Sequence, residues 1–291
     1  MVNNVNTNPG ALVALQNLNR ITDRLEEVQR RVSTGLEVSS AKDNPTLFAL
    51  AQNQRAELGS IESVQQGLRI GVSTVDVALA AGESISDVLV EMRAIASQAA
   101  DPTVSAEDLA IFEEQYVALR DQITRLVESA EVGGRNLIES GANDLVVVAG
   151  PDGATTITVG AQDLSVGGAN VTVSDAATVF VAVADDPGTP GDESMTVSQV
   201  AQAELAAIEA SINNVSSSLG LLGSGANSLE LQGRILTRVS DALEVSIGNL
   251  VDADLARESS RLQALQVQQQ LAIQTLSIAN AAPNAILALF A

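Results

Sequence analysis

The sequence predicts a mainly α-helical protein: a long antiparallel helical bundle or coiled coil, with paired N- and C-terminal helices and a small β-rich insertion. Apolar residues recur three and four apart over long stretches at both ends of the chain, the heptad pattern of helices that pack along a seam. Aromatic residues make up only 2% of a chain that is 46% hydrophobic, which favours thin helical seams over a thick globular core. Short β-branched runs gather in the middle of the chain.

The first expected helix covers residues 10–33 and carries an uninterrupted heptad seam. The seam consists of Ala11, Ala14, Leu18, Ile21, Leu25, Val28 and Val32. Asn8-Pro9 supplies a cap and a first-turn proline, and Gly35 supplies a stop. Because a continuous apolar stripe is unfavourable in water, this helix needs a partner.

A connector follows the first helix. It lacks periodicity and ends in a proline, which disfavours helical geometry at the residue before it. Its residues are Ser40, Ala41, Lys42, Asp43, Asn44 and Pro45.

Two further helices are expected before the insertion. The first covers residues 46–99. The second begins at Ser105, because Asp108 three residues later completes a capping box, and it ends at Gly133-Gly134.

The segment 145–194 changes character and is predicted to be the β-rich insertion. The runs LVVVAG, TTITVG, NVTVS and TVFVAVA predict strands and hairpins, and DDPGTPGDES predicts a surface tip. We expect the insertion at the far end of the helical bundle, with both chain termini together at the opposite end.

After the insertion the heptad pattern returns. It keeps its phase over residues 205–250 through three glycines, which predicts one long helix. Asp252 and Asp254 mark a joint, and the last helix is expected from about Asp254 to Leu289. Its apolar residues spread over an arc too wide for a two-stranded seam, so several neighbours are expected around it. They include Leu255, Leu262, Leu265, Leu271, Ile273, Leu276 and Ile278.

These expectations divide the chain into three parts. Residues 1–44 with 251–291 form the paired terminal helices. Residues 45–144 with 195–250 form a rod of long helices. Residues 145–194 form the exposed insertion.

Composition excludes several classes of function. The 36 acidic residues against 15 basic ones give a formal charge of −21, which opposes binding to nucleic acids and anionic membranes. No run of eighteen apolar residues predicts a membrane span, and the N-terminus does not resemble a cleaved signal. The chain has neither Cys nor His, which removes the usual catalytic triads and zinc sites. We therefore expect no catalytic residue, cofactor or metal, and interpret acidic pairs such as Asp185-Asp186 as solvated surface.

Charges of both signs lie beside the first seam. Arg24, Arg30 and Arg31 neighbour Glu26 and Glu27. They can pair within the helix or between two copies of the chain, and the pattern leaves both options open.

The two ends of the chain resemble bacterial flagellin, the subunit of the flagellar filament. QNLNRITDRLEEVQRRVSTGLEVSSAKDNP at 16–45 is similar to the N-terminal signature of the family, and IGNLVDADLARESSRLQALQVQQQLAIQTLSIANAAPNAILALF at 247–290 to its C-terminal signature. The short length, SAKDN and LVDADLA are typical of the alphaproteobacterial branch.

This resemblance implies a structural protein that self-assembles into a helical filament for swimming. It implies an inner tube built from the terminal helices and an outer tube built from the rod. The apolar residues from Leu18 to Val32 and from Leu255 to Ile278 would then be an assembly seam. The implied partners are other copies of the chain, an export chaperone, the filament cap and hook-junction proteins. The implied location is extracellular, after type III export without a cleaved signal peptide. A hook-filament junction protein, or a secreted enzyme displayed on flagellin-like arms, are the alternatives.

Overall fold

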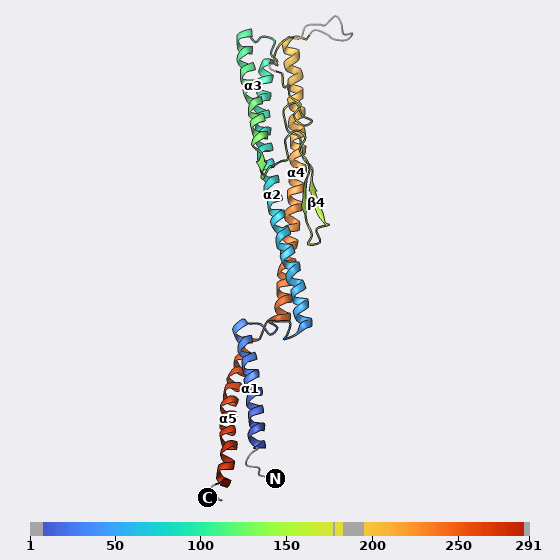
Figure 1. Ribbon diagram of the computed structural model, residues 1–291. Helices are drawn as coiled ribbons and strands as arrows, with labels where there is room; N and C mark the ends of the chain where they lie inside the picture. Colours follow the sequence, from blue (N-terminus) through green and yellow to red (C-terminus); the bar gives the residue numbers. More distant parts are fainter. Residues whose placement is uncertain (1–7, 177, 183–194, 288–291) are drawn as a thin grey trace. The chain divides into compact units, whose positions relative to one another are not determined.

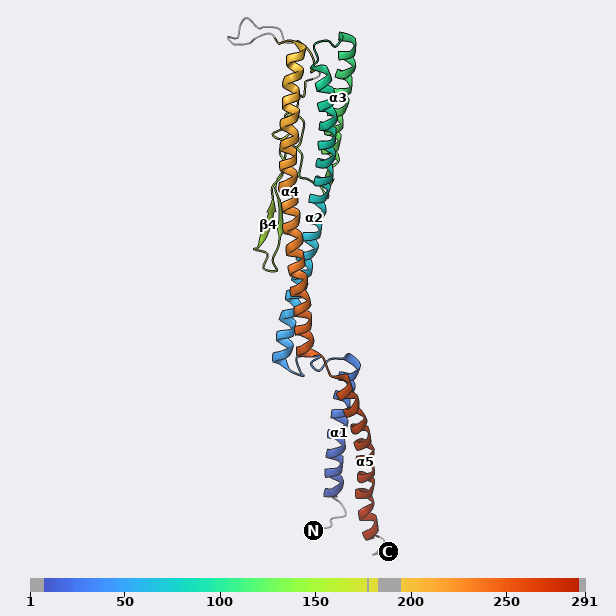
Figure 2. The same cartoon turned by 180° about the vertical axis from the view of Figure 1, so that it is seen from behind.

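The computed structural model describes residues 8–176, 178–182 and 195–287, and it is mainly helical (Figures 1 and 2). The helices are α1 (Pro9–Thr34), α2 (Pro45–Ala99), α3 (Ala106–Ser129), α4 (Val197–Val251) and α5 (Leu255–Leu287). The strands are β1 (Glu131–Val132), β2 (Arg135–Asn136), β3 (Leu145–Val148) and β4 (Thr156–Val159). The predicted fold class is confirmed.

The chain divides into two compact units. Residues 1–59 and 240–291 form the terminal unit, which contains α1 and α5, and residues 60–239 form the middle unit. Each unit has its own buried residues, and each is described by itself.

The helix ends follow the predicted capping chemistry. The Asn8 side chain accepts a hydrogen bond from the Ala11 N–H at 3.1 Å. Gly35 closes α1 with a φ of 73°, a left-handed conformation that favours glycine. At α3 the Ser105 hydroxyl accepts from the Asp108 N–H at 3.2 Å and donates to the Asp108 carboxylate at 2.7 Å. Local sequence therefore sets where these helices begin and end.

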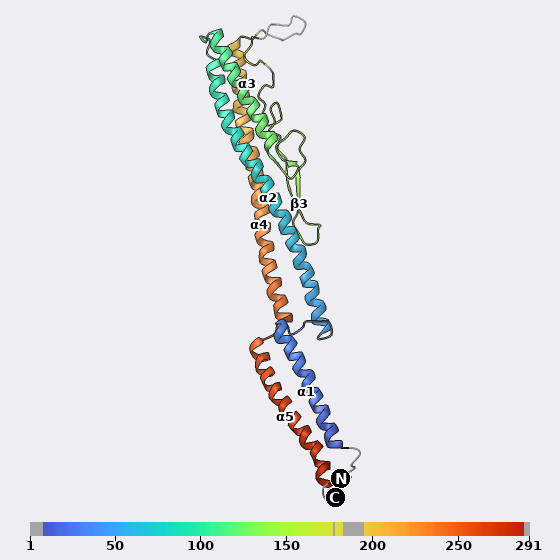
Figure 3. The ribbon, with the colours of Figure 1, turned by 60° about the vertical axis from the view of Figure 1, so that its left-hand side comes forward.

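In the middle unit α2, α3 and α4 lie side by side (Figure 3). Every seventh residue of α4 is buried against the other helices: Ala201, Ile208, Val215, Leu222, Leu229 and Leu236. On α2 the fully or almost fully buried residues include Ile61, Leu68, Val75, Ile85, Leu89 and Met92. The long helix predicted after the insertion is confirmed as α4, which continues through Gly220, Gly223 and Gly225.

A second row of α4 meets the insertion at three of its four positions, and at one of them it also meets α3. It consists of Glu204, Ser211, Ser218 and Gly225, which are small or polar. Ser211 accepts a hydrogen bond from the Thr172 N–H at 2.9 Å, and Glu204 accepts one from the Ser174 N–H at 2.9 Å. This row lies beside the heptad pattern that the sequence predicted over residues 205–250, and it was not foreseen.

The insertion contains fewer strands than predicted. β3 and β4 pair as an antiparallel hairpin from Leu145↔Val159 to Val148↔Thr156. The NVTVS run forms only an isolated bridge, and residues 178–182 of the TVFVAVA run form no strand. Side chains of the helices satisfy these backbone N–H groups instead: the Glu113 carboxylate accepts from the N–H groups of Val179 and Phe180. The predicted surface tip, residues 185–194, lies outside the described residues.

The predicted placement of the insertion at the far end of the bundle is wrong for the β3–β4 hairpin. The hairpin lies along α2 and α4 because two glycines allow close approach. A Cβ on Gly71 would lie 2.8 Å from Val147, and one on Gly225 would lie 2.6 Å from Val159. A second hairpin, β1–β2, turns at the predicted stop Gly133-Gly134 and was not foreseen.

A buried polar contact joins α3, α4 and the insertion. The Tyr116 hydroxyl donates to Glu204, and the Tyr116 ring meets that of Phe180 edge-on at 5.2 Å. Burial of the phenol, reinforced by the negative charge of Glu204, raises the pKa of Tyr116 well above its usual value.

Tyr116 should therefore resist ionisation until the middle unit unfolds. A raised folded-state pKa stabilises the fold below the unfolded value of about 10 and ceases to do so as pH rises above it. Because Tyr116 is the single tyrosine and the chain has no Trp, tyrosinate absorbance near 295 nm reports this residue alone. We expect that absorbance to rise together with loss of helical circular dichroism, whereas the chain in denaturant should titrate near pH 10. Native titration near pH 10 with unchanged helix content would contradict the buried contact.

Candidate functional site

The terminal unit is built on an antiparallel pair of helices, α1 and α5 (Figure 3). On α1 the seam residues Ala14, Leu25 and Val28 are buried. On α5 the covered residues recur four and three apart: Glu258, Leu262, Leu265, Gln269, Ala272, Leu276 and Ala279. This pattern is a two-stranded heptad seam, and it confirms that the first helix pairs with the last.

Polar contacts fix the register of this pair. The Asn8 side chain donates to the Ala279 carbonyl at 2.7 Å, and the Gln269 amide donates to the Thr22 hydroxyl at 3.4 Å. At the other end Arg31 lies 3.8 Å from Glu258. Seams of Ala and Leu can slip by a heptad, whereas polar groups within a seam favour the one alignment that pairs them.

Glu258 is the most buried charged residue of the pair, with 5% of its surface exposed. The Oε1 atom of Glu258 forms an ion pair with Arg261 at 2.6 Å, and Arg31 also forms an ion pair with Glu27 at 2.7 Å. No described group donates to the Oε2 atom. A buried carboxylate needs such pairing, because desolvation otherwise disfavours its charge.

The connector and the joint meet beside this pair. The N–H groups of Glu37 and Val38 donate to the Val251 carbonyl at 2.7 and 3.2 Å, and the Ala253 N–H donates to Gly35 at 2.9 Å. Beside them lies a small apolar core. Its buried members are Val38, Ala51, Ile247 and Val251.

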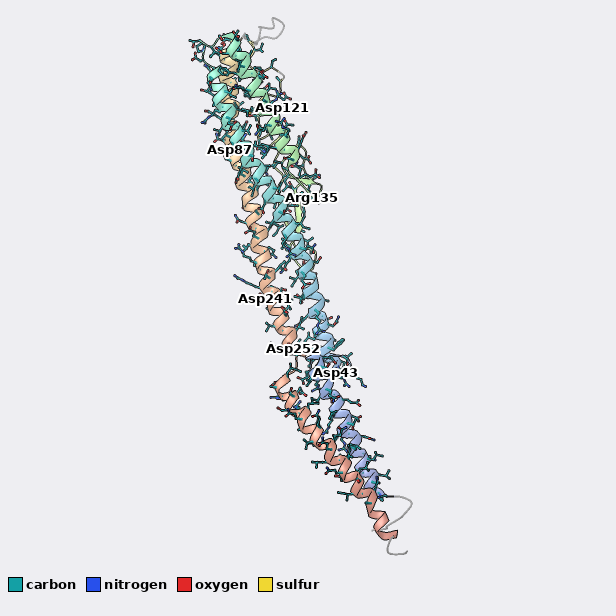
Figure 4. All side chains as sticks on the ribbon, turned by 90° about the vertical axis from the view of Figure 1, so that its left-hand side faces the viewer. Asp43, Asp87, Asp121, Arg135, Asp241 and Asp252 are labelled. Atoms are coloured by element: carbon teal, nitrogen blue, oxygen red, sulfur yellow. The ribbon has the colours of Figure 1, made fainter. Side chains whose placement is uncertain are left out.

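The predicted connector residues act as caps and turns. Asp43 accepts from the N–H groups of Ser39 and Ser40 at 3.1 and 2.9 Å, and the hydrogen bond from the Ser39 hydroxyl is the main cause that lowers the pKa of Asp43. Asn44 caps α2 through the Leu47 N–H at 3.1 Å. Asp254 accepts from the first N–H groups of α5, each at 3.1 Å. Ala41, Lys42, Pro45 and Asp252 are exposed, and Figure 4 labels Asp43 and Asp252.

Both ends of the chain match one family. Residues 5–143 match the bacterial flagellin N-terminal helical region, and residues 205–290 match the bacterial flagellin C-terminal helical region. The chain belongs to the bacterial flagellin family. It is a structural subunit of the bacterial flagellar filament, an extracellular appendage used for swimming.

Individual relatives agree with this family and with its alphaproteobacterial branch. Flagellin FljO of Caulobacter vibrioides is 38% identical over 99% of both chains. A flagellin of Brucella melitensis is 32% identical over 98% of both. A putative flagellar hook-associated protein from Vibrio parahaemolyticus shares the fold, with a TM-score of 0.57 and 17% identity over 72% of this chain and all of that one.

The α1–α5 pair of this flagellin covers only part of its predicted assembly seam. Leu25 and Val28 are buried, and Leu18, Ile21, Val32, Leu262, Leu265 and Leu276 are half-buried. Leu255, Leu271, Ile273 and Ile278 are 48 to 72% exposed. Sequence reasoning missed that Glu258 and Gln269 belong to the covered row; their heptad spacing could have revealed them.

Among the described residues of this flagellin, no group of three or more acidic side chains is arranged to hold a metal ion. No helix in the described ranges is long and apolar enough to cross a membrane.

Proposed function

We propose that the α1–α5 pair is the polymerisation element of this flagellin. Leu255, Leu271, Ile273 and Ile278 remain exposed although α5 has already paired with α1. On α1, Leu12 and Val13 are 58% and 57% exposed as well. Burial of these side chains against further copies would remove apolar surface from water, and the free energy gained would favour assembly. Their exposure is the observation that carries the proposal.

The three parts of the chain then take different places in the filament. Residues 1–44 with 251–291 form the inner tube, residues 45–144 with 195–250 form the outer tube, and residues 145–194 face solvent. Successive copies meet through unlike surfaces, because contacts of this kind extend into a helix when their rotation does not close a ring. The function lies in packing, without an enzymatic activity.

Export and capping belong to the same proposal and rest on family membership. The chain leaves the cell through the type III apparatus of the flagellum, without a cleaved signal peptide. An export chaperone, the filament cap and hook-junction proteins are its other partners.

The test is seeded polymerisation of the purified full-length chain, measured by electron microscopy and sedimentation. We expect filaments that grow to micrometre length, whereas a chain lacking residues 1–40 should stay soluble and keep its middle unit helical. Growth that stops at a short, defined length would favour a junction protein. Normal filaments from the truncated chain would show that the terminal helices are not the polymerisation element.

A further inference from the structure

One side of the α1–α5 pair is hollowed into a groove of about 310 Å³. From α1 it is lined by Asn17, Arg20 and Arg24, and from α5 by Gln268, Leu271 and Thr275 among others. Leu271 is 55% exposed within it. The groove therefore combines an apolar side chain with two arginines.

The two arginines have no counter-charge within the pair. Neither guanidinium forms an ion pair with any side chain that the structure describes. The facing helix cannot supply one, because the sequence contains no charged residue from Leu262 to its last residue. On a chain with a net charge of −21, two neighbouring cations of this kind attract an acidic surface.

A different face of α1 carries the complementary chemistry. Leu12, Leu15, Asn19, Asp23 and Glu26 recur three and four apart, so they share one helix face. All five are exposed. Asp23 and Glu26 form no ion pair among the described side chains. We call these five residues the outer face of α1.

Groove and outer face are complementary in charge. On the outer face the leucines come first along α1 and the acids follow. In the groove, the hydrogen bond between Gln269 and Thr22 places Leu271 level with Arg20, and Thr275 lies about one turn nearer the N-terminal end of α1. Docking with Asp23 and Glu26 over the groove sets acid against arginine, whereas docking with Leu12 and Leu15 over it would oppose charge to apolar surface.

We propose that the groove of one copy receives the outer face of α1 from a second copy, with Asp23 and Glu26 paired to Arg20 and Arg24. The inference rests on the proposed function and names the lateral contact through which the terminal helices associate. The contact joins two unlike surfaces, as an open polymer requires.

Two charge-reversed chains test the contact. The first carries Arg20→Glu and Arg24→Glu, so that its groove and outer face are both acidic. The second carries Asp23→Arg and Glu26→Arg, so that both are basic. We expect each alone to raise the critical concentration for polymerisation at least ~10-fold, because like charges would oppose each other in the contact. An equimolar mixture should polymerise within ~3-fold of wild type, since each copy then meets its complement.

A matched control carries Arg125→Glu and Arg238→Glu, both in the middle unit. It changes the net charge by the same amount as the first chain, at exposed positions outside the groove and free of ion pairs in the described part of the protein. Circular dichroism of each monomer records helix content. We expect the control to polymerise like wild type. If the control is as defective as the first chain, net charge alone explains the defect and the inference is overturned.

The outcomes separate the two proposals. If the wild-type chain forms no filaments, the proposed function fails. If the wild-type chain forms filaments and the acidic chain does so equally well, only the lateral contact fails. A mixture that stays as inactive as its components also overturns the contact, since another partner of the arginines, such as a bound anion, would not be restored by mixing.

Discussion

Replacing Leu25 with aspartate should separate α1 from α5 and abolish filament growth. Leu25 is 8% exposed and lies in the middle of the seam, so the carboxylate would be buried without a cation opposite it. A buried unpaired charge lowers stability by about 4 kcal/mol, and the remaining contacts of this pair of short helices cannot offset that loss. Hydrogen exchange should show protection lost in α1 and α5 and retained in the middle unit, and electron microscopy should show no filaments.

Gln29→Asp provides the control for this change. Gln29 lies one turn along the same helix and is exposed, so the same carboxylate stays in water there. We expect its filaments and its exchange pattern to match those of the unmodified chain. Filaments of normal length from the Leu25→Asp chain would show that seam burial is dispensable for assembly.

Replacing Glu204 with alanine should destabilise the middle unit by about 3 kcal/mol, because two buried donors lose their acceptor. The donors are the Tyr116 hydroxyl and the Ser174 N–H. Glu204 itself is 8% exposed, so water cannot readily replace it. Denaturant unfolding, followed by helical circular dichroism, should give a lower midpoint, and exchange should increase in residues 171–180.

Glu209→Ala is the matched change, since Glu209 lies on α4 and is exposed. We expect its unfolding free energy to stay within about 0.5 kcal/mol of the unmodified chain. Equal effects of the two substitutions would mean that the Tyr116 contact contributes nothing to stability.

Local chemistry explains why the helices could be predicted. Caps such as Asn8 and Ser105, and the stop at Gly35, act within three or four residues, so the sequence shows them directly. The α1 seam could be predicted for the same reason, because heptad spacing defines one face of a helix. What covers that face is a tertiary property, and the last helix was predicted as the partner from the simplest packing of the chain rather than from spacing.

The insertion was harder to predict because its strand-forming runs compete for different partners. β3 and β4 pair with each other. In contrast, the Thr172 N–H donates to the hydroxyl of Ser211, and the Val179 N–H donates to the carboxylate of Glu113. β propensity reports a preference for extended backbone, not the identity of the group that accepts its N–H. The two runs stay extended without joining a sheet for this reason.

The site could be predicted only in part for a related reason. The residues from Leu255 to Ile278 were recognised as apolar, and their wide arc indicated several neighbours. The division between the row that meets α1 and the residues left exposed follows from the antiparallel register, which Gln269 and Glu258 help to fix. Those two polar residues are not distinguished by hydrophobicity.

The uncharged stretch of α5 has a consequence for solvation. From Leu262 onward the chain carries only apolar, amide and hydroxyl side chains. Transfer of such a helix from water into a dry interior removes no ion from its hydration shell, so the large Born penalty of burying a charge does not arise. This stretch of α5 can therefore be enclosed on every side at any ionic strength, and the salt response of the polymer should come from α1, the first turns of α5 and the middle unit.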